Sequence, residues 1–326
     1  MSPSLISVRL THSILALMLL SASGLLSSPF ALAKAPMQKT QAPGFYRTMV
    51  GAFEITAISD GTARMPMDQL MSDPPEKIEE ALRDAHLNAP MEMSVNAYLI
   101  NTGDRLILVD TGSGAGLGPS LGKLATNIVV AGYKPDQIDD ILLTHLHPDH
   151  VGGLTANGTA VFANAIVHAS RLEAEFWLSS SNVAEGGNQA GFVKSVRASL
   201  DPYVRSSRFD PFDGDKEIMA AVRTMSAPGH TPGSVVYVIE SETSKFFVVG
   251  DLIHAGAIQF ARPDITFTFD SDQTKAAGAR RTVFDKAVAE RVLIGAAHLP
   301  FPGLGHIRAE AGAYRWLPLN YSTEFR

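Results

Sequence analysis

The feature that most constrains this chain is a cluster of three histidines and one aspartate within residues 144–150, Thr-His-Leu-His-Pro-Asp-His. Imidazole and carboxylate groups bind zinc and similar divalent ions, and the chain contains no cysteine that could supply a thiolate instead. His145 and His147 are two residues apart at the end of an expected strand, so both side chains can bind one ion. Asp149 and His150 follow a proline, where the chain turns, and can reach a second ion. The cluster therefore predicts a metal-binding loop.

Three later residues complete a set of ligands for two ions. His230 lies in the turn Pro-Gly-His-Thr-Pro-Gly, Asp251 follows an apolar strand-like run, and His298 follows the last such run. Taken alone, each would more often be a turn residue or a polar cap than a ligand. Together with the first cluster they supply seven ligands, three or four for each ion, and Asp251 is well placed to bridge the two.

Composition and charge exclude several classes of function. The chain has 326 residues, a net charge of −6 and no basic run, which argues against nucleic acid or an anionic membrane as the main partner. The absence of cysteine excludes disulfide scaffolds, iron–sulfur clusters and thiol nucleophiles. No Gly-x-Ser-x-Gly motif is present, so no serine nucleophile of that kind is expected.

The N-terminal segment is typical of a secretory signal peptide. Arg9 precedes an apolar run at residues 13–26, and Ala31-Leu-Ala33 provides a small-x-small cleavage signal. The apolar run is shorter than the ~20 residues that span a bilayer, so cleavage is favoured over stable membrane anchoring. We expect a signal peptide at 1–33, a leader at 34–44 and one folded domain at 45–326, exported to the periplasm or secreted.

The rest of the chain alternates between strand-like and helix-like segments. Strands are expected at residues 52–59, 95–100, 105–109, 138–143, 235–239, 245–249 and 292–296, the first ending in a turn at Asp60-Gly61. Helices are expected at 121–131, 171–178, 192–200 and 274–291. Each half of the chain thus contains both element types, and two sheets covered by outer helices would satisfy this order.

The order His-x-His-x-Asp-His, then a later His, Asp and His, resembles the metallo-β-lactamase superfamily from about Tyr46 to the C-terminus, including the run Val-Asp-Thr-Gly at 109–112. The resemblance implies an α/β fold, an αββα sandwich with a dinuclear metal site at one edge of its two sheets. It implies that one ion is held by His145, His147 and His230, the other by Asp149, His150 and His298, with Asp251 between them. Asp110 would orient a ligand histidine from behind.

Short segments at 43–46, 53–56, 59–61, 173–179 and 301–310 look like methyl parathion hydrolase and its dihydrocoumarin-lactonase relatives, which implies a homodimer. In this resemblance the substrate pocket is lined near Met65, Met67, Leu70, Trp177, Phe192, His254, Phe267 and Phe269. The phosphotriesterase has arginine in place of Leu70, leucines in place of His254 and Phe269, and a small polar residue in place of Phe267. The bulkier walls should crowd a dimethyl phosphotriester more than a planar lactone.

The sequence therefore predicts a hydrolase that uses two divalent metal ions to open lactones and aryl esters of the dihydrocoumarin type. A hydroxide bridging the ions would attack the carbonyl, with Asp251 shared between the ions and Asp149 as proton acceptor. Zinc is the first expectation for the metal, although manganese, cobalt and iron accept the same ligands. The expected partner is a small-molecule ester, and we assign His168 and His306 only local hydrogen bonds.

Three alternatives stay open. The first is an organophosphate triesterase, which differs from a lactonase only in its pocket. The second is another branch of the superfamily: a β-lactamase, glyoxalase II or an RNA-processing nuclease. The acidic net charge disfavours the nuclease, and the predicted export disfavours glyoxalase II. The third is a non-catalytic periplasmic metal-binding module, although seven ligands for two ions leave room for water. A turnover assay on the metal-loaded protein distinguishes this last alternative from an enzyme.

Overall fold

The computed structural model describes residues 35–179 and 188–324, without the side chains of residues 188 and 189. The expected signal peptide at 1–33 lies outside the described residues. Residues 1–41 and 42–326 are separate units of structure, and the fold described below belongs to the second. Within the described residues, no helix has the length and apolarity needed to cross a membrane.

Among the described residues, the first sheet contains seven strands in the order β1-β2-β3-β4-β5-β8-β9. Their bounds are β1 Phe45–Val50, β2 Phe53–Met65, β3 Met91–Asn101, β4 Leu106–Val109, β5 Asp140–Leu142, β8 Ile166–Ser170 and β9 Phe209–Phe212. The first four pair antiparallel, and β4, β5, β8 and β9 pair parallel. The predicted hairpin at 95–109 is confirmed as β3 and β4.

The second sheet, within residues 188–324, runs in chain order from β10 to β16. Its strands are β10 Glu217–Met219, β11 Val222–Ser226, β12 Val235–Ser241, β13 Ser244–Val248, β14 Leu293–Gly295, β15 Leu304–Glu310 and β16 Ala313–Pro318. Only β13 and β14 pair parallel in it. The parallel pair is joined through the long helix α8, Gln273–Glu290, which confirms the helix predicted at 274–291.

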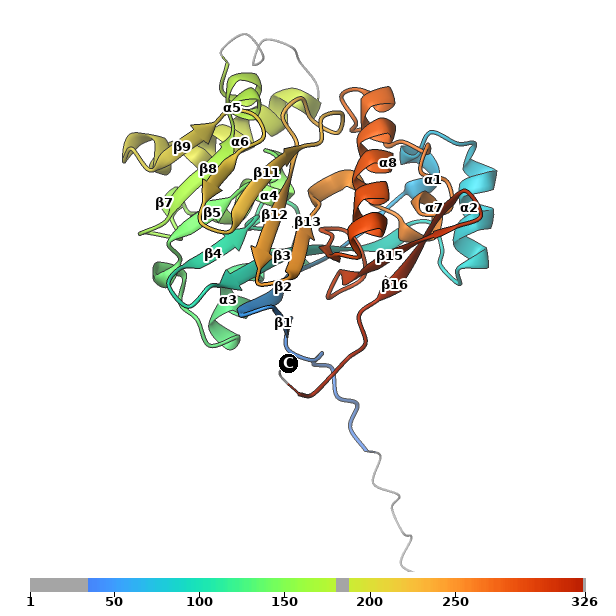
Figure 1. The fold of residues 1–326 in the computed structure, drawn as a ribbon, viewed down its shortest axis with the longest axis horizontal. Coiled ribbons are helices and arrows are strands. Elements are labelled where there is room, and N and C mark those ends of the chain that lie inside the picture. Colours follow the sequence, from blue (N-terminus) through green and yellow to red (C-terminus); the bar gives the residue numbers. More distant parts are fainter. Residues whose placement is uncertain (1–34, 180–187, 325–326) are drawn as a thin grey trace, which may run out of the picture. The chain divides into compact units, whose positions relative to one another are not determined.

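The helices of the described residues are arranged around the two sheets (Figure 1). They are α1 Met67–Leu70, α2 Pro75–Asp84, α3 Leu124–Val130, α4 Pro148–Val151, α5 Arg171–Leu178, α6 Asn188–Arg205, α7 Gly256–Gln259 and α8. Short 3-10 turns are formed by η1 Pro135–Gln137, η2 Gly152–Leu154 and η4 Gly250–Leu252. A small separate hairpin consists of β6 Thr155–Ala156 and β7 Thr159–Ala160. The helix predicted at 171–178 is confirmed, whereas α3 is shorter and α6 longer than expected.

Alternating side chains of each strand divide the apolar residues into layers. Tyr98 of β3 and Tyr237 of β12 belong to a cluster between the sheets, whereas their neighbours Leu99 and Val238 face outward into the helix layers. The outer face of the first sheet packs on α3, α4 and α6, and the outer face of the second packs on α8. The predicted αββα sandwich is therefore confirmed.

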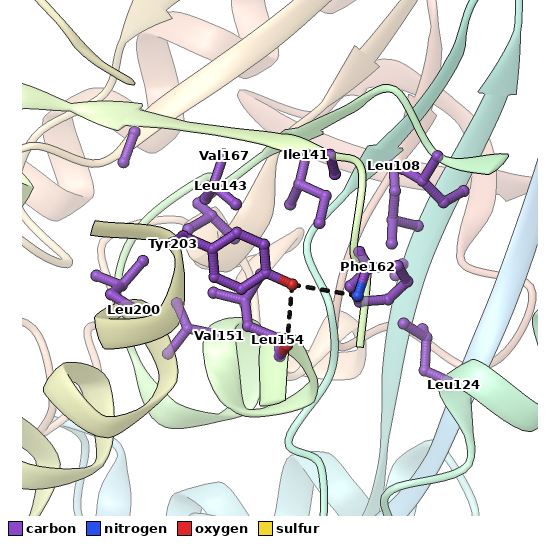
Figure 2. Close-up of a cluster of buried hydrophobic side chains, with 14 of the residues drawn as sticks. Leu108, Leu124, Ile141, Leu143, Val151, Leu154, Phe162, Val167, Leu200 and Tyr203 are labelled. Carbon is purple, nitrogen blue, oxygen red and sulfur yellow. Dashed lines mark hydrogen bonds between the residues drawn. The ribbon is translucent and has the colours of Figure 1, made fainter. Parts of the chain in front are cut away.

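The helix layer of the first sheet is anchored by Tyr203 of α6 (Figure 2). This side chain is fully buried among aliphatic residues. Its hydroxyl donates to Leu154 O at 3.0 Å and accepts from Phe162 N at 3.2 Å, so this buried polar atom is satisfied. The helix α6 is thereby held against the segment that follows the histidine cluster.

The predicted end of the first strand at Asp60-Gly61 is wrong. Instead β2 continues to Met65 through a β-bulge between Ser59 and Gly61, where Gly61 has a φ of +130°. The bulge turns the carboxylate of Asp60 inward, where it accepts hydrogen bonds from the backbone of the segment 113–124. An Asp-Gly pair thus serves here as a bulge that anchors a loop, and not as a hairpin turn.

Candidate metal centre

All seven predicted ligand side chains lie at one edge of the two sheets. His145 and His147 follow β5 of the first sheet, and Asp149 and His150 lie in the short helix α4 that comes next. From the second sheet, His230 lies between β11 and β12, Asp251 follows β13, and His298 follows β14. The two sheets meet here through a backbone hydrogen bond from Val235 N to Thr144 O at 2.9 Å.

The turn after β13 brings Asp251 inward because of the glycine that precedes it. Gly250 has a φ of +52°, and a Cβ there would lie 2.8 Å from the hydroxyl oxygen of Thr144. Any larger residue would therefore separate the loop of Asp251 from the histidine loop. The Val-Gly-Asp order in the sequence is thus a local requirement of the site.

The seven side chains form two groups that share Asp251. His145, His147 and His230 make the first group with Asp251, and Asp149, His150 and His298 make the second; the candidate ligand atoms of each group all lie within 4.8 Å of one another. The carboxylate oxygens of Asp251 lie 3.2 Å from His230 Nε2 and 3.0 Å from His150 Nε2. This is the pairing that the resemblance implied.

The donor atoms fit divalent cations. Among the described residues, His145 Nε2, His150 Nε2 and Asp251 Oδ1 are buried side-chain atoms without a hydrogen-bond partner. Buried polar atoms are rarely left unsatisfied, and a bound ion is one ordinary reason for such an atom. The three atoms named above lie together in one cluster of imidazole and carboxylate donors, and such donors suit zinc and related metals.

The histidines are oriented from behind by groups distant in the chain. Asp110 Oδ2 lies 2.9 Å from His150 Nδ1, as predicted, and also accepts from the Thr144 hydroxyl at 2.8 Å. Asp270 Oδ1 lies 2.8 Å from His230 Nδ1, and the carbonyl of Ser94 lies 2.9 Å from His298 Nδ1. Such partners fix which ring nitrogen faces the metal. The last two were missed by the sequence analysis, because nothing near them in the sequence marks them.

The charges within the cluster are strongly coupled. Burial raises the pKa of Asp251, but the surrounding histidines, His150 first, outweigh burial and hold that pKa well below its usual value. Burial lowers the pKa of His230, but hydrogen bonds to Asp251 and Asp270 raise it to about 9. Burial lowers the pKa of His145 well below its usual value, and the neighbouring His150 lowers it further. One buried carboxylate thus balances several imidazoles, and a bound cation would displace protons from this cluster.

Two cavities open beside the ligands. One of about 410 Å³ lies directly against His147, Asp149, His230, Asp251 and His298. The second, of about 370 Å³, shares His147 and His230 with it. A larger hollow of about 760 Å³ between β1 and the C-terminal segment contains none of the candidate ligands, so size does not mark the reactive site.

The predicted pocket residues fall mostly on the walls of these two cavities. Met65, His254 and Phe267 line the first, Leu70 and Trp177 line the second, and Phe192 and Phe269 line both. The ring of His254 stacks on Phe267 at 4.2 Å, and its Nε2 lies 3.2 Å from Asp251 Oδ2. Met67 lines neither cavity: it is fully buried with α2 and α7 residues in a separate core cluster, because it lies on the inner side of the short helix α1.

Other wall residues were missed. Arg64, Met93 and Val95 come from β2 and β3, and residues 117–121 come from the loop that Asp60 anchors. No motif marks them, because a wall is made by whichever strands and loops border the site. His168 and His306 make the local contacts expected of them: His168 Nε2 lies 3.1 Å from Asp140 Oδ1, and His306 Nδ1 lies 2.8 Å from the carbonyl of Val292.

Comparison with known proteins agrees with this geometry. The hydrolase AbOPH of the beta lactamase superfamily is 34% identical, covers 87% of this chain and 100% of its own, and superposes with a TM-score of 0.83. AidC, described as a dizinc quorum-quenching lactonase, is 28% identical, covers 86% of this chain and 99% of its own, and has a TM-score of 0.78. An N-acyl homoserine lactonase of Bacillus thuringiensis is 30% identical over 173 residues, 47% of this chain and 61% of that lactonase. The chain thus spans about three fifths of the curated lactonase that it matches.

A family profile described as metallo-beta-lactamase superfamily matches residues 91–298, which is most of the chain and includes every candidate ligand. The match begins with β3 and ends on His298, so it covers the elements that build the metal centre from both sheets. Fold, ligand groups and relatives therefore lead to one assignment. The chain belongs to the metallo-beta-lactamase superfamily, and it is similar to proteins described as a hydrolase and as lactonases.

Proposed function

We propose that this protein hydrolyses lactones and aryl esters with two divalent metal ions, zinc first among them. One observation carries the proposal: two ligand groups that share Asp251 lie at the floor of a cavity with largely apolar walls. The relatives described as lactonases support the same substrate class. A flat ring or an acyl chain suits walls made of aromatic and methionine side chains.

Two divalent cations held by these ligands supply an acidified water as nucleophile and Lewis acidity toward the carbonyl oxygen. The protein's own groups do the rest. The Asp149 side chain is 21% exposed and lines the cavity, so its carboxylate can take the proton of the attacking water and return it to the departing alkoxide. The stacked pair His254 and Phe267 and the ring of Phe269 hold the ester over the ligands and exclude bulk water.

Phosphotriesters are the second candidate substrates, because a two-metal site serves attack at phosphorus as well as at carbon. The walls argue against efficient turnover of a dimethyl phosphotriester. Phe269 contacts both Phe192 and Phe267, with ring centroids 6.0 Å and 5.4 Å apart, so three aromatic rings crowd the approach. We therefore propose methyl parathion as a poor substrate at most.

The test is kcat/KM of the metal-loaded protein on dihydrocoumarin, an N-acyl homoserine lactone and methyl parathion, measured in parallel. A large excess for either lactone supports the proposal. A large excess for methyl parathion contradicts the argument from the walls and leaves the metal centre standing. Two bound ions with no turnover of any substrate would favour a non-catalytic metal-binding module. Asp149→Asn should lower kcat by removing the proton acceptor, and because Asp149 is also a candidate ligand of the second ion, the ion content of this variant is measured in the same experiment.

A further inference from the structure

A buried carboxylate outside the seven ligands connects the two loops that carry the first ligand group. Glu173 lies in the first turn of α5 and is fully buried. It ligates nothing in either group, and the proposed chemistry does not use it. Its hydrogen bonds nevertheless reach both sheets.

One oxygen of this carboxylate holds the histidine loop of the first sheet. Glu173 Oε2 accepts a hydrogen bond from the backbone N–H of Leu146 at 3.0 Å. Leu146 is the residue between His145 and His147, so the bond acts at the centre of the His-x-His segment. A backbone amide fixed at this point sets the direction of the side chains on either side of it.

The other oxygen holds the loop of the second sheet. Glu173 Oε1 accepts from the backbone N–H of Gly233 at 2.7 Å, three residues after His230. The loop is packed closely against α5 here, since a Cβ on Gly233 would lie 2.7 Å from the backbone nitrogen of Glu173. The glycine that ends the Pro-Gly-His-Thr-Pro-Gly turn is therefore required for this contact.

The same carboxylate also fixes a wall of the substrate cavity. The indole N–H of Trp177 donates to Glu173 Oε2 at 2.9 Å, one helical turn later on α5. The Trp177 ring in turn packs edge-on against the His147 ring, with centroids 5.4 Å apart. Glu173 therefore holds both Trp177 of the cavity wall and the loop that carries His147.

We infer that Glu173 is a positioning residue: its two carboxylate oxygens hold the loops of His145, His147 and His230 at the separation that one metal ion requires. The histidines of the second ligand group contact other partners instead, Asp110 and the carbonyl of Ser94, so we expect them to depend less on Glu173. The inference rests on the proposed metal centre but not on the identity of the substrate.

The test is Glu173→Gln in the full-length protein, stripped of metal and titrated with Zn²⁺ and Co²⁺ against a competing chelator. A glutamine has one acceptor oxygen and a donating NH₂, so one of the two loops loses its acceptor and faces another donor. We expect affinity for one of the two ions to fall tenfold or more, as when other groups behind a metal ligand are removed. His230→Ala and His298→Ala show which ion belongs to which group.

Matched variants complete the experiment. Glu175→Gln makes the same chemical change at an exposed position of the same helix and should leave both affinities unchanged. Asp110→Asn should weaken the ion of the second group instead. Trp177→Phe removes one hydrogen-bond donor from Glu173 Oε2 and keeps an aromatic ring, so it should lower the affinity for the ion of the first ligand group a few-fold. This variant tests the inference even where Glu173→Gln is too unstable to purify.

The inference would be overturned if Glu173→Gln lowered the affinities for both ions equally or changed neither affinity. It would also be overturned if Trp177→Phe left both affinities unchanged. A wild-type protein that fails to bind two ions would refute the proposed function itself. Two ions with the expected selectivity but no ester hydrolysis would keep the role of Glu173 and reject the enzyme. The three outcomes are therefore distinguishable.

Discussion

At the scale of single residues, the metal centre depends on partners that stand behind the ligands. Asp110, Asp270 and the carbonyl of Ser94 each lie within 2.9 Å of a ligand histidine, on the ring nitrogen opposite the metal face. Each of these hydrogen bonds selects one tautomer and one ring orientation. The candidate metal centre therefore includes residues beyond the seven candidate ligands.

Asp270→Asn should lower affinity for the ion of the His230 group about tenfold, because the amide is a weaker acceptor for the imidazole N–H than the carboxylate. Competition titration with a chelator measures the change. Asp264→Asn, an exposed aspartate six residues earlier, is the control and should bind both ions normally. An unchanged affinity in Asp270→Asn would mean that the hydrogen bond at 2.8 Å does not orient His230.

A second residue-scale prediction concerns acid stability at Asp140, far from the metal ligands in the fold. Burial raises the pKa of this carboxyl, but hydrogen bonds from His168 and Arg105 outweigh burial and lower it below 3.8. A lowered pKa in the folded state adds stability that is complete above the unfolded value of 3.8 and is lost as the pH falls through the folded value.

Asp140→Asn should therefore destabilise the metal-free protein by about 1–3 kcal/mol at pH 7, and the difference from wild type should shrink below about pH 4. Urea unfolding at both pH values measures it. Asp104→Asn, in the exposed turn before β4, should change stability by less than about 0.5 kcal/mol. A difference that stays constant down to pH 3 would contradict the assigned linkage.

At the scale of elements, the strand ends of both sheets supply the ligands, and the connecting segments supply the walls. Phe267 and Phe269 lie between α7 and α8, Phe192 lies on α6, and Leu70 ends α1. These elements belong to different layers, and their side chains meet only above the metal centre. Pocket shape can therefore change without any change in the ligands.

Phe269→Leu should raise kcat/KM for methyl parathion relative to dihydrocoumarin about tenfold, because a smaller side chain relieves the crowding beside Phe192 and Phe267. The ratio of the two specificity constants is the measurement. Phe209→Leu, in β9 of the first sheet, is the matched control and should leave the ratio at the wild-type value. A constant ratio in both variants would show that Phe269 does not select the substrate.

At the scale of the whole molecule, two sheets must come together before the site exists. The first sheet supplies four candidate ligands and the second supplies three, and Asp251 of the second sheet belongs to both groups. Each group thus contains side chains from both sheets. Metal binding should for this reason stabilise the complete sandwich and neither half alone.

The predicted export also concerns the whole chain. We predict that the protein recovered from a secretion-competent bacterial host begins at Lys34, after cleavage at Ala31-Leu-Ala33. Intact-mass measurement of the recovered protein checks the prediction, and light scattering of the same sample tests the predicted homodimer. Ala33→Arg should block cleavage, and an uncleaved wild-type protein would refute the signal peptide.

Local sequence indicated the candidate ligands and, among the described residues, seven of the strands and four of the helices. The chelating order of histidines and aspartates is short-range, and the absence of cysteine leaves only oxygen and nitrogen donors for a metal. Continuous apolar runs likewise predicted β12 and β13, and helix-like segments predicted α5 and α8. Asp60-Gly61 was misread as a turn, because a bulge and a turn use the same residues and only the distant partners of Asp60 distinguish them.

Tertiary structure alone decided the supporting groups and the walls. Asp270 lies 40 residues from the histidine it orients, and Glu173 lies 60 residues from Gly233, so no local pattern could reveal either role. The same holds for Met67, which packs into the core, and Leu70, which lines a cavity one turn later. A ligand is chosen by its own chemistry and can be recognised in the sequence, whereas a positioning group or a wall is defined by what lies beside it after folding.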